Sequence, residues 1–165
     1  MNALPLYCYI FIASLAVSHS VYFYPALPQT MASHFGSGGA PNTFVAKQSF
    51  FAVAGVVLLI NIFVFMAIPW LFQRFRVKRM NLPNKRYWLA PERLDHVYEY
   101  FRNKMALFGI INLLFGIAVM HLVFLAKLQG EGKLDNTMFL LFLIAYFAFV
   151  IIWLISFFKK FSRIS

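Results

Sequence analysis

The chain has 165 residues, of which 62% are hydrophobic and only 12% carry a charged side chain. Soluble domains devote about a quarter of their residues to charge, so this composition excludes an ordinary water-soluble globule. The single cysteine, Cys8, cannot form an internal disulfide or a CxxC redox pair. A net charge of +10 would suggest nucleic-acid binding in a soluble protein. In a membrane protein such charge sets the orientation, and we expect no nucleic-acid partner.

Four segments free of Asp, Glu, Lys and Arg are each long enough to cross about 30 Å of hydrocarbon as a helix. Lipid offers backbone groups no hydrogen-bond partner, and the alternation typical of barrel strands is absent, so these segments predict helices. The first of these segments has no basic residues before it, and its apolar run is longer than the core of a signal peptide. We therefore expect that it is not cleaved off as a signal peptide. The predicted fold is all-α, an integral membrane four-helix bundle in a single domain (1–165), with spans at residues 4–24, 49–71, 105–126 and 138–158.

Basic residues are distributed unequally between the two sides that these spans define. Residues 72–104 and the tail after residue 158 carry twelve Lys and Arg residues, against three on the opposite side. Because positively charged loops stay in the cytoplasm, the sequence predicts a bacterial cytoplasmic (inner) membrane protein with both termini inside. Residues 25–48 then form an outward loop, and residues 72–104 form a cytoplasmic segment.

The outward loop has prolines at both ends and three glycines between them. Proline fixes the chain direction and glycine permits tight turns, so we expect an ordered loop that folds back on the bundle mouth. It is the candidate binding loop, and its candidate residues are Leu27, Pro28, His34, Phe35, Gly36, Gly39, Pro41, Asn42 and Lys47.

The cytoplasmic segment is too long for a plain connection. Pro91 can open a helix in which Leu94, Val97 and Tyr98 share an apolar stripe. We therefore predict one amphipathic cytoplasmic helix whose stripe lies at the headgroup boundary and runs into the third span. A basic cluster upstream is expected to contact anionic lipid or a partner, and its members are Arg74, Arg76, Lys78 and Arg79.

A family resemblance rests on motifs in a fixed order: Leu27-Pro28, His34-Phe35-Gly36, Gly39-Ala40-Pro41-Asn42 and Lys47, followed by Asn81-Leu82-Pro83-Asn84 and Tyr87-Trp88. In these motifs the chain resembles a family of small bacterial multi-pass membrane proteins of largely unknown function. The domain of that family also forms the N-terminal part of SdpI-type toxin immunity proteins. Over about residues 15–115, the resemblance implies a role in toxin immunity or signalling.

Three histidines are expected near the outer ends of the spans. His19 and His121 lie at similar depth in the first and third spans, and His34 lies in the loop above them. Three imidazoles suffice to bind zinc or copper, and two could bind a haem iron. The alternative, which we favour, is that they are neutral and hydrogen-bonded, with no cofactor. In that case the His34 ring would hold the turn at 36–39 by a hydrogen bond to the loop backbone.

Two further features of the spans predict helix packing. Asn61 in the second span and Asn112 in the third fall near the midplane, and we expect them to hydrogen bond to each other. Gly109 and Gly116 share one helix face, where small residues allow a neighbouring helix to approach closely.

No catalytic or nucleotide-binding motif is present, and the five acidic residues are dispersed, so we predict that the chain is not an enzyme. The leading hypothesis is a non-enzymatic binding or regulatory protein whose outward loop engages a peptide, a toxin or an envelope component. The alternative is a structural accessory subunit of a larger membrane complex, because spans rich in phenylalanine can bind other helices as readily as the lipid bilayer.

Overall fold

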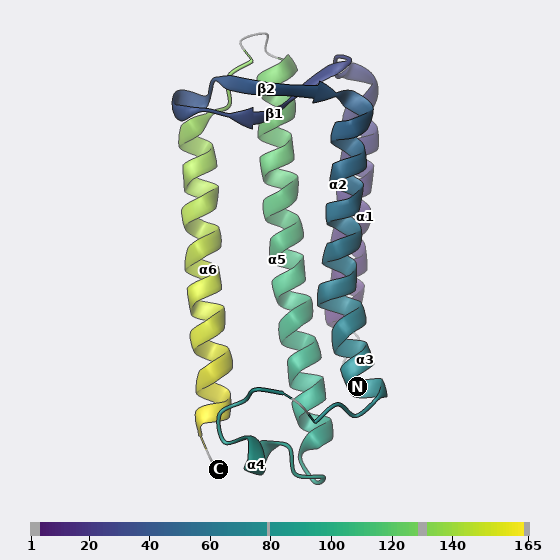
Figure 1. Cartoon of the computed structure of the whole chain (residues 1–165), viewed down its shortest axis with the longest axis vertical. Coiled ribbons are helices and arrows are strands. Elements are labelled where there is room, and N and C mark those ends of the chain that lie inside the picture. The colour runs from purple at the N-terminus through teal and green to yellow at the C-terminus, as the bar shows by residue number, and fades with distance from the viewer. Residues whose placement is uncertain (1–3, 79, 129–131, 164–165) are drawn as a thin grey trace.

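Four long helices stand side by side in the computed structural model, which describes residues 4–78, 80–128 and 132–163 (Figure 1). Each is long and apolar enough to cross a membrane. The first is α1 (Leu4–Phe23); the second is α2 (Lys47–Ile62), continued by the π-helical turn η3 (Phe63–Ala67) and α3 (Ile68–Arg74); the third is α5 (Leu94–Leu128) and the fourth α6 (Asn136–Ser162). The predicted helical membrane fold with four spans is therefore confirmed.

The predicted outward loop forms a β-hairpin that the all-α prediction missed. Strand β1 (Thr30–Phe35) pairs antiparallel with β2 (Pro41–Ala46), and the short helical turns η1 (Tyr24–Ala26) and η2 (Ser37–Gly39) flank β1. The strands are short and poor in β-branched residues, so neither composition nor alternation indicated them. The hairpin crosses the end of the bundle opposite the two termini (Figure 1). We call these the hairpin end and the termini end.

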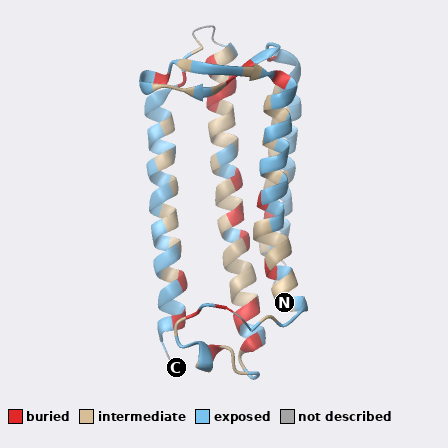
Figure 2. Ribbon diagram, in the orientation of Figure 1, coloured by how far each residue is buried: buried red, intermediate tan, exposed pale blue. Residues whose placement is uncertain are grey.

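Helix α5 is the central column, and buried residues concentrate along it and at the two ends of the bundle (Figure 2). At mid-length, Gly109 lets two neighbours come close: a Cβ there would lie 2.6 Å from Cε2 of Tyr9 and 2.7 Å from Cβ of Phe65. On the other side of α5, the ring of Phe115 stacks on Tyr146 of α6 with centroids 4.6 Å apart. Contacts of this kind hold α1, η3 and α6 against α5.

The second span is not a regular helix throughout, because Pro69 has no N–H to donate to the turn before it. The adjacent N–H of Ile68 donates to the Phe63 carbonyl, five residues back, which is the π-helical pattern. The widened turn contains Phe65, the residue that packs against Gly109. A proline thus shapes the place where the second span meets α5.

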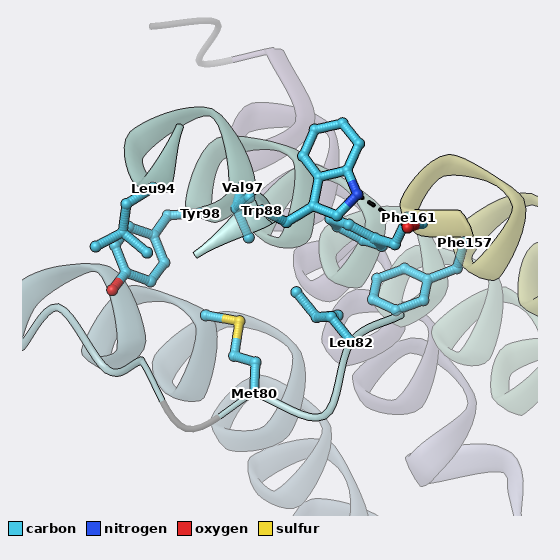
Figure 3. Packing of buried hydrophobic residues seen from close by; sticks show 8 residues of the cluster. All are labelled: Met80, Leu82, Trp88, Leu94, Val97, Tyr98, Phe157 and Phe161. Carbon is cyan, nitrogen blue, oxygen red and sulfur yellow. Dashed lines mark hydrogen bonds between the residues drawn. The ribbon is translucent and has the colours of Figure 1, made fainter. Parts of the chain in front are cut away.

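The predicted amphipathic helix forms as the first turns of α5, but its stripe does not face the membrane. Helix α5 begins at Leu94, and Pro91 lies in the turn before it. Leu94, Val97 and Tyr98 are at most 2% exposed. They belong to a core with the connecting chain and the end of α6, whose other members are Met80, Leu82, Trp88, Phe157 and Phe161 (Figure 3). Residues 80–88 return beneath the bundle and cover the stripe, so the stripe packs on protein and not on lipid as expected.

Candidate functional site

Lys47, predicted as part of the binding loop, turns inward at the first residue of α2. It is 6% exposed, and its ammonium donates to the carbonyls of Leu27 at 2.8 Å and Tyr24 at 3.2 Å. The ammonium also lies 4.5 Å from the centroid of the Tyr24 ring. A buried charge is tolerated only with such partners, which satisfy its donors and its positive charge. Lys47 therefore joins the start of the second span to the end of the first.

The turn of the hairpin is docked on the chain that leads into α6. Gly39 has φ +78°, and its carbonyl accepts a hydrogen bond from the N–H of Leu134 at 2.8 Å. A Cβ on Gly39 would lie 2.2 Å from the Leu134 carbonyl oxygen, so no other residue fits this contact unchanged. Within the turn, the N–H of Gly36 donates to the Ala40 carbonyl at 2.7 Å. Both ends of the hairpin are thus fixed to the bundle.

The two strands of the hairpin differ in how deeply they are buried. On β1, Met31 and Ala32 are buried, and Met31 joins a core cluster with Leu122 and Phe124 of α5. Most of β2 is exposed, and Phe44 keeps 53% of its surface accessible. Leu27 belongs to the same cluster as Met31. The hairpin is therefore a platform with one anchored strand and one exposed strand.

Phe44 was not among the candidate binding residues of the loop, and the structure gives it a partner distant in sequence. The ammonium of Lys127, at the end of α5, lies 4.6 Å from the centroid of the Phe44 ring. No local pattern in the sequence links these two residues, because the contact exists only once the hairpin lies across α5. Together they place an aromatic ring and a positive charge side by side at the hairpin end.

His34 lies in an exposed part of β1, where the strand register is irregular. Its Nδ1 lies 3.2 Å from the hydroxyl oxygen of Ser33. Among the described residues, the expected hydrogen bond from its ring to the backbone of the turn is not formed; the turn closes through its own backbone groups and Leu134. His34 thus remains accessible on the hairpin.

His19 of α1 and His121 of α5 do meet, as their equal depth predicted. Nε2 of His19 lies 3.1 Å from Nδ1 of His121, so one ring donates and the other accepts. The His19 ring also stacks on Phe124, with centroids 5.4 Å apart. His34 does not join them, and in the described parts of the chain no three His, Cys, Asp or Glu side chains are grouped to hold a metal ion. The three-histidine site for a metal or haem is therefore not formed.

A cavity of about 250 Å³ lies between α1, α2 and α5, with His19 among its lining residues. Gly55 and Gly116 also line it, and a Cβ on either glycine would meet no atom within 4 Å. The space beside Gly116 is therefore empty, whereas neighbouring side chains occupy the space beside Gly109 on the same helix. Of the two glycines predicted to allow close helix packing on α5, Gly109 does so and Gly116 instead borders the cavity.

The two intramembrane asparagines take tyrosine partners rather than each other. The hydroxyl of Tyr9 donates to Oδ1 of Asn61 at 2.5 Å. Nδ2 of Asn112 donates to the hydroxyl of Tyr146 at 3.0 Å. The predicted Asn61–Asn112 bond was wrong: both asparagines line the cavity between α1, α2 and α5, but each amide is hydrogen-bonded to a tyrosine.

The predicted basic cluster lies at the termini end. Arg74 is in the last turn of α3, and Arg76 forms an ion pair of 3.1 Å with Asp95 at the start of α5. Both partners are more than half exposed, so this pair stabilises the fold little. Lys78 lies in the chain that follows, and Arg79 lies outside the described residues. Contact of this cluster with lipid or a partner remains a prediction.

By the length and composition of its four spans, the chain is a multi-pass membrane protein. Residues 10–60 match a domain of unknown function, DUF1648, so this domain comprises most of α1, the hairpin and most of α2. No curated protein and no solved structure matches the chain. The match covers the candidate binding loop and supports the resemblance to a domain of unknown function; it does not show the link to SdpI-type immunity.

Proposed function

We propose that the chain is a non-enzymatic binding or regulatory protein whose hairpin recognises an extended peptide. The observation that carries this proposal is the contrast between the two strands: β1 is anchored on α5, while β2 is exposed. β2 pairs with β1 along one edge, and its second edge has no strand beside it in the described chain. Extended peptides bind such edges through main-chain hydrogen bonds.

The anchoring of the hairpin favours this role energetically. Binding is weakened when a loop must be ordered at the same time, so a platform already fixed at both ends binds at lower entropic cost. Lys47 fixes one end and the Gly39–Leu134 contact fixes the other. The exposed ring of Phe44 then supplies an apolar contact for a peptide side chain.

The resemblance to SdpI-type proteins supports a peptide toxin or signal as the ligand. In this proposal, the protein holds the peptide at the membrane surface, and the basic termini end reports its presence to the cell or anchors lipid. The DUF1648 match, over residues 10–60, includes the hairpin motifs on which the resemblance rests.

The test uses the full-length protein in lipid nanodiscs, immobilised and exposed to the peptide fraction of culture supernatant from the source strain. We expect a small peptide to be retained by the wild type and lost from Phe44→Asp. Val57, 58% exposed in the middle of α2, offers the control substitution Val57→Leu, which leaves the hairpin intact. Equal retention by all three proteins, or no retained peptide, would contradict the proposal. Growth of toxin-sensitive cells that express each variant then separates immunity from signalling.

A second candidate function is an accessory subunit of a larger membrane complex, and α6 favours it. The most apolar stretch of α6 contains no buried residue, and Ile144, Ile152 and Ile155 are each more than 60% exposed. Helices of partner proteins could cover this surface as well as lipid could. Gentle detergent extraction followed by sizing and mass spectrometry distinguishes the two: a large particle of defined composition supports the subunit, and a lone small particle contradicts it.

A further inference from the structure

Two adjoining hollows lie at the termini end, between α4 (Lys85–Trp88), the start of α5 and the end of α6. Their volumes are about 610 Å³ and about 370 Å³, and they share Trp88 and Lys160 in their walls. Neither hollow belongs to the hairpin end. They are also separate from the basic cluster around Arg74, none of whose described members lines them.

The walls of the hollows are strongly positive. Arg93 and Lys160 line the first, and Lys159 and Arg163 join Lys160 in the second. Among the described residues, Glu99 is the one carboxylate that lines either hollow. Within the described residues, Arg76 and Asp95 form the one ion pair of the protein. The four cations of the hollows therefore have no carboxylate partner among those residues. They retain their full charge for an external anion.

Aromatic rings hold two of these cations in place. The guanidinium of Arg93 lies 4.0 Å from the centroid of the Tyr87 ring, and the ammonium of Lys160 lies 5.1 Å from that of Trp88. The Trp88 ring is itself fixed, because its Nε1 donates to the Phe161 carbonyl at 2.9 Å (Figure 3). Cation–π contacts position a charge without neutralising it, so the site is preorganised for an anion.

The position of the second hollow along α6 indicates the source of the anion. Lys159 and Lys160 follow directly on the apolar run of α6, at the level where a spanning helix leaves the hydrocarbon. One to two turns further into the helix, Trp153 donates to the Lys104 carbonyl at 2.9 Å, as an interfacial aromatic residue anchored near the helix end. The cations therefore lie at the depth of lipid headgroups.

We propose that these hollows form a binding site for the phosphate-bearing headgroup of an anionic phospholipid in the leaflet at the termini end. Arg93 and Lys160 contact the phosphate from the first hollow, and Lys159 and Arg163 from the second. Trp88 forms the wall between them, against which the glycerol backbone packs. Each cation near an anionic headgroup favours binding by about fivefold.

The experiment measures lipid binding to the full-length protein by native mass spectrometry in detergent, with phosphatidylglycerol and phosphatidylcholine as competing probes. We expect a preference for phosphatidylglycerol that falls by about 25-fold in Arg93→Gln/Lys160→Gln. The matched control is Lys85→Gln/Arg86→Gln, which removes the same charge from the same end of the bundle but from outside the hollows. We expect the control to lose less than threefold.

A second variant guards against a folding effect, because Arg93 and Lys160 contact aromatic rings within the protein. Lys159→Gln/Arg163→Gln removes charge from the second hollow without touching those contacts, and it should also lose about 25-fold. Equal losses in this variant and in the control would overturn the site, since they would indicate diffuse attraction. Inorganic phosphate is the third probe: if it displaces phosphatidylglycerol at low millimolar concentration, the ligand is free phosphate and the lipid assignment is wrong. No displacement supports the lipid.

Discussion

The ammonium of Lys47 lies 2.8 Å from the carbonyl oxygen of Leu27, so a buried positive charge at the start of the second span holds the chain that leaves the first. The same ammonium reaches the Tyr24 carbonyl at 3.2 Å. These bonds bring the two ends of the hairpin segment together. The hairpin is therefore fixed by a charge that faces inward.

Replacing this lysine should loosen the hairpin. Lys47→Met keeps much of the side-chain volume but removes the donors, which leaves the Leu27 carbonyl unpaired at a cost of about 1–3 kcal/mol. We expect faster hydrogen exchange at the amides of residues 30–46, with the spans unchanged. Lys133→Met, which removes an exposed charge at the same end, is the control. Unchanged protection of the hairpin in Lys47→Met would show that the clamp contributes nothing.

The His19–His121 pair predicts a non-additive pattern of stabilities. Either single change, His19→Leu or His121→Leu, leaves the other imidazole without its partner and should cost about 1–3 kcal/mol. The double change removes both polar groups and should cost less than the sum of the two singles. Unfolding in detergent measures the three free energies. Additive costs would mean that the two rings do not interact.

Gly109 and Gly116 should respond oppositely to the same substitution. Gly109→Ala places a Cβ 2.6 Å from Tyr9 and 2.7 Å from Phe65, and such overpacking costs about 1–3 kcal/mol. Gly116→Ala meets no atom within 4 Å and gains helix propensity, so it should be neutral or stabilising by up to about 1 kcal/mol. Thermal unfolding of both variants provides the comparison, and a Gly109→Ala protein as stable as Gly116→Ala would refute the close packing.

The distribution of basic residues predicts that the termini end is cytoplasmic. Single cysteines at Ser37 and Asn81, both exposed, can be placed in a Cys8→Ser background. An impermeant thiol reagent added to intact cells should label Ser37→Cys and spare Asn81→Cys until the membrane is opened. The reverse pattern would place the hairpin inside.

The sequence by itself determined the four spans and the similar depth of His19 and His121, because both follow from the length of apolar runs and from counting residues along helices. It also indicated an ordered loop, since prolines and glycines restrict or permit backbone angles locally. Helix α5 begins eleven residues before the predicted span, and the apolar stripe that starts at Leu94 indicated this amphipathic extension of the span.

Only the tertiary structure decided which groups face each other. The partners of Asn61 and Asn112 depend on how each helix is rotated about its axis, and four uniformly apolar spans carry almost no periodic signal for that rotation. The inward turn of Lys47, the contact of Gly39 with Leu134 and the burial of the α5 stripe beneath residues 80–88 join segments far apart in the chain. Such contacts are selected by the packing of the whole bundle, which a local pattern cannot encode.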